Sequence, residues 1–262
     1  MPILRAFAVI SLAAYASAQS LSSACTTALT SVALNPDAAA CLSPSSLIPI
    51  ATGGANKSVV APINNWLTAV CGAPACSNAT IAAVVTNITT GCATDLAATG
   101  FTSDLTPTIT TLVEQYYPTV RQVICLKDGS TNCITETLTN IEAIVGPLTL
   151  TNILSIAANP PSTIPTNITC SNCIKAAYNI IAKDVPSIVS EAAPALQSQC
   201  GASFTDGATP SGISESATNA ALASTSSKAA AAGSVAMLSQ GLVAGLAASG
   251  LVIGSTLFTL LA

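Results

Sequence analysis

Ten cysteines lie between residues 25 and 200 of this 262-residue chain, and none lies outside that stretch. An even number of cysteines confined to one stretch is typical of a secreted domain in which every cysteine is paired. We therefore predict five disulfides, each contributing about 2–4 kcal/mol to stability, mainly by restricting the unfolded chain. The spacing leaves the pairing open. The cysteines are Cys25, Cys41, Cys71, Cys76, Cys92, Cys125, Cys133, Cys170, Cys173 and Cys200.

Two close pairs of cysteines, Cys71-x4-Cys76 and Cys170-x2-Cys173, are also similar to metal-binding or redox motifs. A structural zinc site requires four suitably spaced ligands and a compartment that keeps thiols reduced. A thioredoxin-like pair requires a strand leading into it, whereas Cys170 follows a proline-rich stretch over residues 159–165. We therefore expect disulfides at both pairs, and neither a metal ion nor another cofactor.

The N-terminus has the pattern of a secretory signal peptide. Arg5 supplies a positive charge, residues 6–14 are almost entirely apolar, and Ala16-Ser17-Ala18 matches the small-x-small motif that signal peptidase recognises. We predict a signal peptide over residues 1–18 and a mature chain that begins at Gln19. The apolar run is too short to span a bilayer, which requires about 20 residues.

Residues 241–262 form a second apolar block without a charged residue. The block is long enough to span a membrane, but no basic residue follows it as in a span with a cytoplasmic side. Small residues over 226–234 followed by an apolar tail are typical of a signal for attaching a glycosylphosphatidylinositol (GPI) lipid. We predict this signal over residues 235–262, with a retained membrane helix as the alternative. The candidate attachment residues are Ser227, Ala231 and Gly233.

Composition divides the remaining chain at residue 201. Residues 202–234 are mainly Ser, Thr, Ala, Gly and Asn and have no periodic apolar pattern. Such a segment buries too little surface to offset its ordering entropy, so we predict a disordered, O-glycosylated stalk. Residues 19–201 contain all ten cysteines and are long enough to build one hydrophobic core.

Four Asn-x-Ser/Thr sequences lie within residues 19–201. They are acceptors for N-glycosylation in secreted proteins, and together with the two processing signals they predict a glycoprotein. The acceptor residues are Asn56, Asn78, Asn87 and Asn167.

Apolar residues recur at helical spacing through the cysteine-rich region. Cysteines share several of these apolar stripes, so we expect disulfides to join helix to helix. Few alternating runs are long enough for a sheet, and we predict an all-α, disulfide-stapled multi-helix domain followed by the disordered stalk. The predicted helices cover residues 21–34, 62–71, 81–92, 109–127 with a kink or break at Pro118, 133–145, 150–158, 170–181 and 186–200.

The cysteines also fall into two successive sets of five, from Cys25 to Cys92 and from Cys125 to Cys200. Each set ends in a close pair followed by a final cysteine, although the spacings within the sets differ. This pattern leads to the hypothesis that the domain consists of two similar helical halves.

The stretch from Tyr116 to Asp128, with Cys133 and the run Cys-Ser-Asn-Cys-Ile-Lys-Ala-Ala-Tyr over residues 170–178, carries a family resemblance. It resembles an uncharacterised, cysteine-rich helical family of secreted, often GPI-anchored proteins from basidiomycete fungi. The resemblance covers most of residues 25–200. It implies a fungal cell-surface or cell-wall setting and brings no catalytic residues.

A more local similarity links Cys71-x4-Cys76 and Cys92 to elicitins, which are small helical disulfide proteins that bind sterols. The x15 spacing before Cys92 is close to the x14 spacing of elicitins, but their flanking spacings differ and they have six cysteines. Helical disulfide domains can enclose an apolar cavity, so a lipid- or sterol-binding module is an alternative function. Its candidate lining residues are Ile63, Trp66, Leu67, Val70, Ile174, Tyr178 and Ile181.

Composition excludes several classes of function. The net charge of −4 provides no basic face for the phosphates of nucleic acids. Because the chain has no histidine, it cannot form a Ser-His-Asp or Cys-His nucleophile system. We therefore expect a non-enzymatic glycoprotein at the outer face of the plasma membrane or in the cell wall. Its expected partners are the membrane through its GPI lipid, cell-wall glycans and a lipid ligand.

A glycosidase that uses two carboxylates is a third alternative. Such an enzyme needs two acids about 5–9.5 Å apart beside a sugar-binding cleft. The acids are scattered along the chain, Glu136 and Glu142 are expected on a solvated helix face, and few aromatic residues could form a sugar platform. The acids are Asp37, Asp95, Asp104, Glu114, Asp128, Glu136, Glu142, Asp184, Glu191, Asp206 and Glu215.

Overall fold

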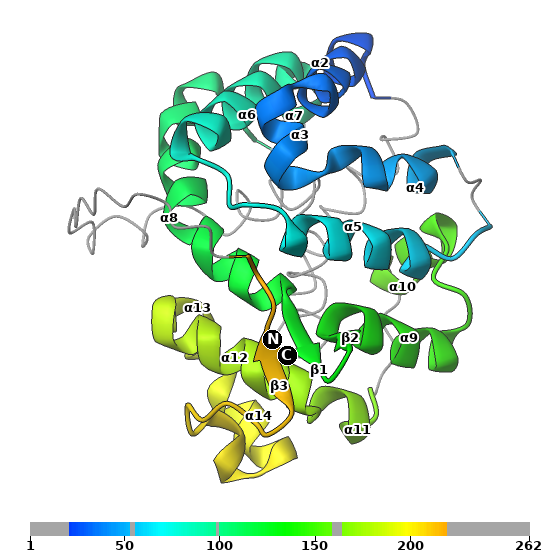
Figure 1. The fold of residues 1–262 in the computed structure, drawn as a ribbon, viewed down its shortest axis with the longest axis vertical. Coiled ribbons are helices and arrows are strands. Elements are labelled where there is room, and N and C mark those ends of the chain that lie inside the picture. Colours follow the sequence, from blue (N-terminus) through cyan, green and yellow to red (C-terminus); the bar gives the residue numbers. More distant parts are fainter. Residues whose placement is uncertain (1–20, 53–55, 98–99, 159–163, 219–262) are drawn as a thin grey trace.

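A computed structural model describes residues 21–52, 56–97, 100–158 and 164–218 of the chain (Figure 1). Helices make up 72% of these residues, which confirms the all-α prediction. None of the helices in these ranges combines the length and apolar character needed to cross a membrane. The predicted signal peptide, residues 219–234 of the predicted stalk, and the attachment signal with Ser227, Ala231 and Gly233 lie outside the described residues.

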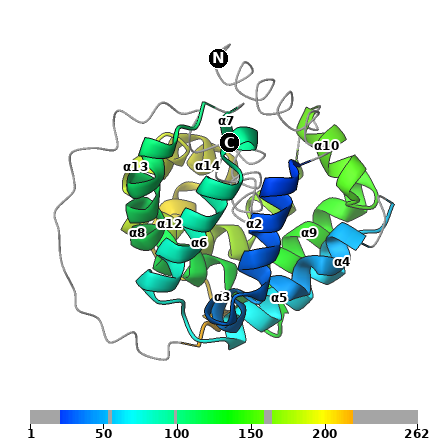
Figure 2. The same cartoon turned by 90° about the horizontal axis from the view of Figure 1, so that it is seen from above.

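The N-terminal layer consists of helices α2 (Ser23–Leu34), α3 (Pro36–Leu42) and α6 (Asn78–Gly91). Side-chain caps define where each begins, because Ser22, Asn35 and Ser77 accept hydrogen bonds from backbone N–H groups of the first turn. Asn35-Pro36 ends α2 and starts α3, since proline is well suited to the first helical position. In Figure 2, α2 lies beside α6.

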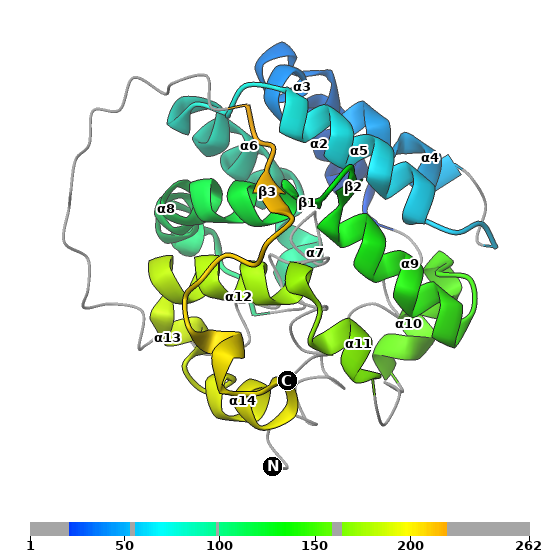
Figure 3. The ribbon, with the colours of Figure 1, turned by 60° about the horizontal axis from the view of Figure 1, so that its bottom comes forward.

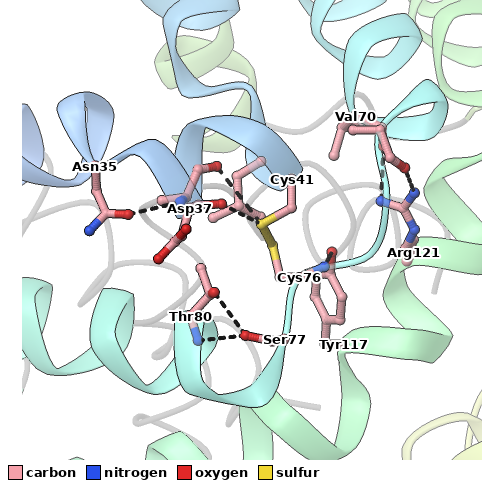
Figure 4. The surroundings of a disulfide bond; sticks show 12 residues. Asn35, Asp37, Cys41, Val70, Cys76, Ser77, Thr80, Tyr117 and Arg121 are labelled. Atoms are coloured by element: carbon pink, nitrogen blue, oxygen red, sulfur yellow. Dashed lines mark hydrogen bonds between the residues drawn. A yellow bond between two sulfur atoms is a disulfide. The ribbon is translucent and has the colours of Figure 1, made fainter. Parts of the chain in front are cut away.

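Two nested disulfides staple this layer. Cys25–Cys92 joins the start of α2 to the end of α6, and Cys41–Cys76 joins the end of α3 to the residue before the cap of α6. Figure 4 shows the second bridge beside Tyr117, whose hydroxyl oxygen accepts a hydrogen bond from the Cys76 N–H at 3.0 Å. Helix α6 is therefore tied to α2 at its C-terminal end and to α3 at its N-terminal end.

The middle of the domain is built around α5 (Val60–Gly72), α8 (Thr106–Ile124) and α9 (Cys133–Val145). Apolar residues of α5 and α9 share one core cluster, and Cys71–Cys125 ties the end of α5 to the end of α8. Helix α8 contains Pro118 and runs on to Ile124 without the predicted break. The remaining short elements here are η1 (Pro44–Leu47), α4 (Ile48–Thr52), α7 (Ala93–Ala97), η2 (Ser103–Leu105) and α10 (Leu150–Ala158).

A small sheet, which the sequence did not predict, follows α8. Its strands are β1 (Leu126–Asp128), β2 (Thr131–Asn132) and β3 (Ile213–Glu215), in the order β2-β1-β3 with both pairings antiparallel. Gly129 turns the β1–β2 hairpin with a φ of 56°, a conformation that glycine adopts readily. The predicted helix over 109–127 therefore ends at Ile124 because the chain turns into this hairpin.

The C-terminal layer contains α11 (Thr166–Thr169), α12 (Asn172–Asp184), α13 (Pro186–Val189), α14 (Ala193–Cys200) and η3 (Ala202–Thr205). The disulfides Cys133–Cys173 and Cys170–Cys200 join this layer to α9 and close it on itself. The predicted helix over 186–200 is divided into α13 and α14 by a turn. All ten cysteines are thus paired, which confirms the five predicted disulfides.

The folded domain extends beyond residue 201, so the predicted start of the stalk at residue 202 is wrong (Figure 3). Phe204 is buried among Tyr178, Val189 and Leu196. Beyond it, β3 pairs with β1, and the Thr218 N–H donates to the carbonyl oxygen of Cys71 at 2.9 Å. Backbone pairing and one aromatic anchor order this segment, and neither requires apolar periodicity.

The disulfide topology lends no support to two similar helical halves. In the first set of five cysteines, the first pairs with the fifth and the second with the fourth, so one bridge encloses the other. In the second set, the second pairs with the fourth and the third with the fifth, so the bridges interleave. The remaining cysteine of each set forms the Cys71–Cys125 link between the sets.

Candidate functional site

Two open grooves flank helix α6, and the exposed residues Thr86 and Thr90 form the ridge between them. The larger, the α2–α6 groove, has a volume of about 880 Å³ and is lined by Ser23, Ala24, Thr27, Ala28, Ser31, Ala82, Ala83, Thr86, Asn87, Thr90 and Gly91. The smaller, the α6–α8 groove, has a volume of about 550 Å³ and is lined by Thr86, Thr89, Thr90, Ala93, Ser103, Thr106, Pro107 and Thr110.

The α2–α6 groove exists because two closely packed helices face each other with small side chains. The Cys25–Cys92 disulfide brings the two Cα atoms within 4.2 Å. One turn along, Gly91 lies against Ala28, and a Cβ at residue 91 would be only 2.2 Å from the Ala28 Cβ. With Ala, Ser and Thr along both helices, no long side chain fills the space above this contact.

Three of the hydroxyl groups along the grooves donate to carbonyl groups of their own helices. Thr27 Oγ1 donates to the Ser23 carbonyl at 2.8 Å, Ser31 Oγ to the Thr27 carbonyl at 2.9 Å, and Thr110 Oγ1 to the Thr106 carbonyl at 2.9 Å. Each of these hydroxyl oxygens keeps lone pairs that can accept a hydrogen bond. None of the described residues lining either groove is charged, so the grooves offer neutral acceptors and methyl groups.

Asp95 in α7 is hydrogen-bonded to the residue that caps α2. The Asp95 carboxylate accepts hydrogen bonds from Ser22 N–H at 2.9 Å and from Ser22 Oγ at 2.6 Å. These bonds, the hydroxyl first, hold the pKa of Asp95 below its usual value. Both acceptor oxygens of Asp95 are used to fix the start of α2 against α7.

A pair of acids, Asp128 and Glu136, lies beside the Cys133–Cys173 disulfide. The carboxylate oxygens of Asp128 and Glu136 and the Cys173 sulfur are all within 4.8 Å of one another. The sulfur is bonded to Cys133, which leaves two carboxylates rather than three ligands. Partial burial and then the nearby charge of Asp128 raise the pKa of Glu136. Glu136 is therefore half-buried beside a like-charged carboxylate, and the predicted solvated position is wrong.

Glu142 is also not a free surface acid. Its carboxylate accepts a hydrogen bond from the Leu148 N–H at 2.9 Å and so closes the turn after α9. Neither groove is lined by any of the eleven acids proposed for a glycosidase. Asp128 and Glu136, the two acids beside the Cys133–Cys173 disulfide, line neither groove.

The four N-glycosylation acceptors all lie at exposed positions, on different parts of the surface. Asn78 and Asn87 are both on α6, Asn56 precedes α5, and Asn167 is in α11. In the part of the chain that the structure describes, their side-chain amides make no hydrogen bonds. A glycan on any of them would therefore break no hydrogen bond among the described residues. Only Asn87 lines a groove.

The residues predicted to line a lipid cavity fall into two separate groups. The group on α5 packs against α9 and the residues around Cys125, whereas the group on α12 packs against α13, α14 and η3. Neither group lines a groove. The α5 group is Ile63, Trp66, Leu67 and Val70, and the α12 group is Ile174, Tyr178 and Ile181.

The sequence did not predict either groove. Their only sequence signal is the run of small residues at helical spacing on α2 and α6, such as Ala24 with Ala28 and Ala82 with Thr86. Small residues at this spacing mark a face of close packing but do not say which helix lies against it. The partner follows from the Cys25–Cys92 pairing, which the spacing left open.

Comparison with protein-family models matches residues 11–209 to a domain of unknown function, DUF7729. The match extends past residue 201, in agreement with the folded segment that contains Phe204. No curated protein and no solved structure matches the chain significantly.

Proposed function

This chain belongs to the DUF7729 family, and from that premise we propose that it is a non-enzymatic, disulfide-stapled glycoprotein that is secreted and held at the cell surface by a GPI lipid. Its place is the outer face of the plasma membrane or the cell wall. The resemblance to secreted, often GPI-anchored proteins of basidiomycetes supports a fungal setting.

The complete pairing of ten cysteines carries this proposal. Five disulfides within residues 25–200 persist only where thiols are oxidised, as they are outside the cell and in the secretory pathway. The bridges connect every layer of the fold. A reduced chain would lose about 2–4 kcal/mol for each of them.

The positions of the four glycosylation acceptors add a second, independent support. Buried or hydrogen-bonded asparagines would be poor acceptors in a folded product, yet all four are exposed and their amides are unpaired among the described residues. Secretion and N-glycosylation belong to the same pathway. The acceptor positions thus agree with the compartment that the disulfides indicate.

The GPI anchor rests on the sequence of residues 226–262. Small residues suitable for attachment, including Ser227, Ala231 and Gly233, precede the uncharged apolar block over 241–262. The described part of the domain extends to Thr218. A short stalk from residue 219 would then connect the domain to the lipid.

Phosphatidylinositol-specific phospholipase C tests the anchor on cells that express the full chain. The enzyme cleaves the lipid, so we expect the protein to move from the membrane fraction to the supernatant. The matched control is a chain that stops at Ser234, which we expect in the medium without treatment. Full retention of the intact protein on the membrane after treatment would count against a GPI anchor. Mass spectrometry of the released C-terminal peptide would assign Ser227, Ala231 or Gly233.

A further inference from the structure

We propose that the N-glycan carried by Asn87 lies in the α2–α6 groove, packed along the small residues of both helices. This inference deepens the proposed function and rests on its secretory, glycosylated setting. The observation that carries it is positional. Asn87 is the one acceptor among the four that forms part of a groove wall.

Asn78 provides the contrast on the same helix. Both asparagines are exposed on α6, but Asn78 is at the first turn and belongs to neither groove lining. Asn87 lies nine residues further along, near the stapled end where Gly91 meets Ala28. A glycan on Asn87 starts inside the groove, whereas one on Asn78 starts in open solvent.

The chemistry of the groove suits the first sugars of an N-glycan. An N-acetylglucosamine unit has hydroxyl and amide donors, and the oxygens of Thr27 and Ser31 have lone pairs free to accept them. Its C–H faces can contact the methyl groups of Ala24, Ala28 and Ala83. Because no charged residue lines the groove, a neutral sugar would bury no unpaired charge there.

The groove has room for this occupant. Its volume of about 880 Å³ lies within the range of about 300–1,000 Å³ that is usual for small-molecule sites. It has no aromatic residue in its lining, so a free oligosaccharide would gain little there. A tethered glycan needs much less affinity, because a short linkage raises its local concentration to about the millimolar range.

The full chain, secreted from a eukaryotic host with high-mannose glycans, allows a direct test. Mass spectrometry first gives the occupancy of each acceptor, and endoglycosidase H then cleaves the native protein over time. A glycan docked for about nine-tenths of the time is cleaved about tenfold more slowly, so we expect that difference between Asn87 and Asn78. In the reduced, denatured chain the two rates should become equal.

Two substitutions at exposed positions distinguish docking from a merely slow site. Ala83→Phe, on α6, places a ring in the groove and is expected to raise the cleavage rate at Asn87 toward that at Asn78. Ala61→Phe, on α5, adds the same ring outside both groove linings and outside every acceptor sequence, and is expected to leave the rates at Asn87 and Asn78 unchanged.

The outcomes separate this inference from the proposed function. Equal native cleavage rates at Asn87 and Asn78, no effect of Ala83→Phe, or an unoccupied Asn87 beside occupied acceptors would each overturn the docked glycan alone. Absence of glycans at all four acceptors would overturn the proposed glycoprotein as well.

Discussion

Gly91 lies so close to Ala28 that a Cβ at residue 91 would be 2.2 Å from the Ala28 Cβ. Real Cβ atoms do not approach this closely, so Gly91→Ala must push α2 and α6 apart. The Cys25–Cys92 bridge one residue away limits that movement. We expect a loss of about 1–3 kcal/mol, as for other overpacking substitutions. Thermal unfolding followed by circular dichroism would measure it, at about 2–4 °C per kcal/mol in a domain of this size.

Gly72→Ala is the matched control for Gly91→Ala. Gly72 is the last residue of α5, and a Cβ there would meet nothing within 4 Å. We expect the melting temperature of the Gly72→Ala variant to equal or slightly exceed that of the unmodified chain. If Gly91→Ala and Gly72→Ala melted together, α2 and α6 could not be in the contact described.

Arg121 is buried, and none of the described carboxylates pairs with it. Its side chain instead supplies a hydrogen-bond donor that the backbone after α5 lacks. Its guanidinium donates to the Val70 carbonyl at 2.9 Å and also to the Ala73 carbonyl (Figure 4). The Val70 oxygen would normally accept from residue 74, but Pro74 has no N–H. The negative end of the α5 dipole also favours a positive charge here.

Arg121→Met is expected to destabilise the domain by about 2–3 kcal/mol, because two buried carbonyls lose their donors. Arg121→Lys should recover only part of this loss, since an ammonium group does not reproduce the guanidinium fork. The midpoint of guanidinium chloride unfolding would measure both. Lys183→Met, at an exposed position on α12, is the control. An unchanged midpoint for Arg121→Met would contradict the capping role.

The sequence predicts most of the helices but gives no indication that Arg121 is buried. Helices α9 and α10 begin and end as predicted because apolar periodicity and turn residues are local signals. The burial of Arg121 depends on the proline that follows a different helix, α5, and no local pattern around Arg121 encodes this. A charged residue in an amphipathic helix is ordinarily exposed. Its position therefore required the packing of α5 against α8.

The small sheet and the grooves were missed for a related reason. Asp128-Gly129 is a recognised hairpin signal, but the flanking strands are two and three residues long and show no alternation. β3 is far along the chain and pairs through its backbone, so its side chains gave no indication. The α2–α6 groove needs the Cys25–Cys92 pairing, which spacing alone does not select.

Phe204 anchors the segment that the sequence assigned to a disordered stalk. It is 4% exposed and packs with Tyr178 and Leu196. We expect Phe204→Ala to cost about 3–5 kcal/mol, as for other buried phenylalanines. Leu34→Ala, at a position 76% exposed, should change stability by no more than about 0.5 kcal/mol.

Two truncated chains give a second readout of the same boundary. A chain that stops at Gly201 lacks Phe204 and β3, and it should unfold at a lower temperature. The backbone amides of β1 should also exchange their hydrogens faster in this chain, because β3 no longer pairs with β1. A chain that stops at Thr218 should behave like the full chain. Equal melting temperatures for the two would place the boundary back at residue 201.

Glu136 makes the stability of the domain depend on pH. Partial burial, with the charge of Asp128 as a smaller contribution, raises the pKa of Glu136 above its usual value. The folded state thus binds this proton more tightly than the unfolded state. Stability therefore falls as the pH rises from the unfolded-state pKa, about 4.3 for glutamate, through the higher folded-state pKa.

Glu136→Gln removes this ionisation and is expected to raise the melting temperature at pH 7. At pH 3, where Glu136 is protonated in both states, the difference should be much smaller. The gain is limited, because Glu136 is only partly buried and the first turn of α9 itself favours a negative charge. Glu191→Gln, at an exposed position, controls for the substitution itself. A variant that was destabilised at pH 7 but not at pH 3 would show that the charged Glu136 carboxylate stabilises the fold, contrary to its position beside Asp128.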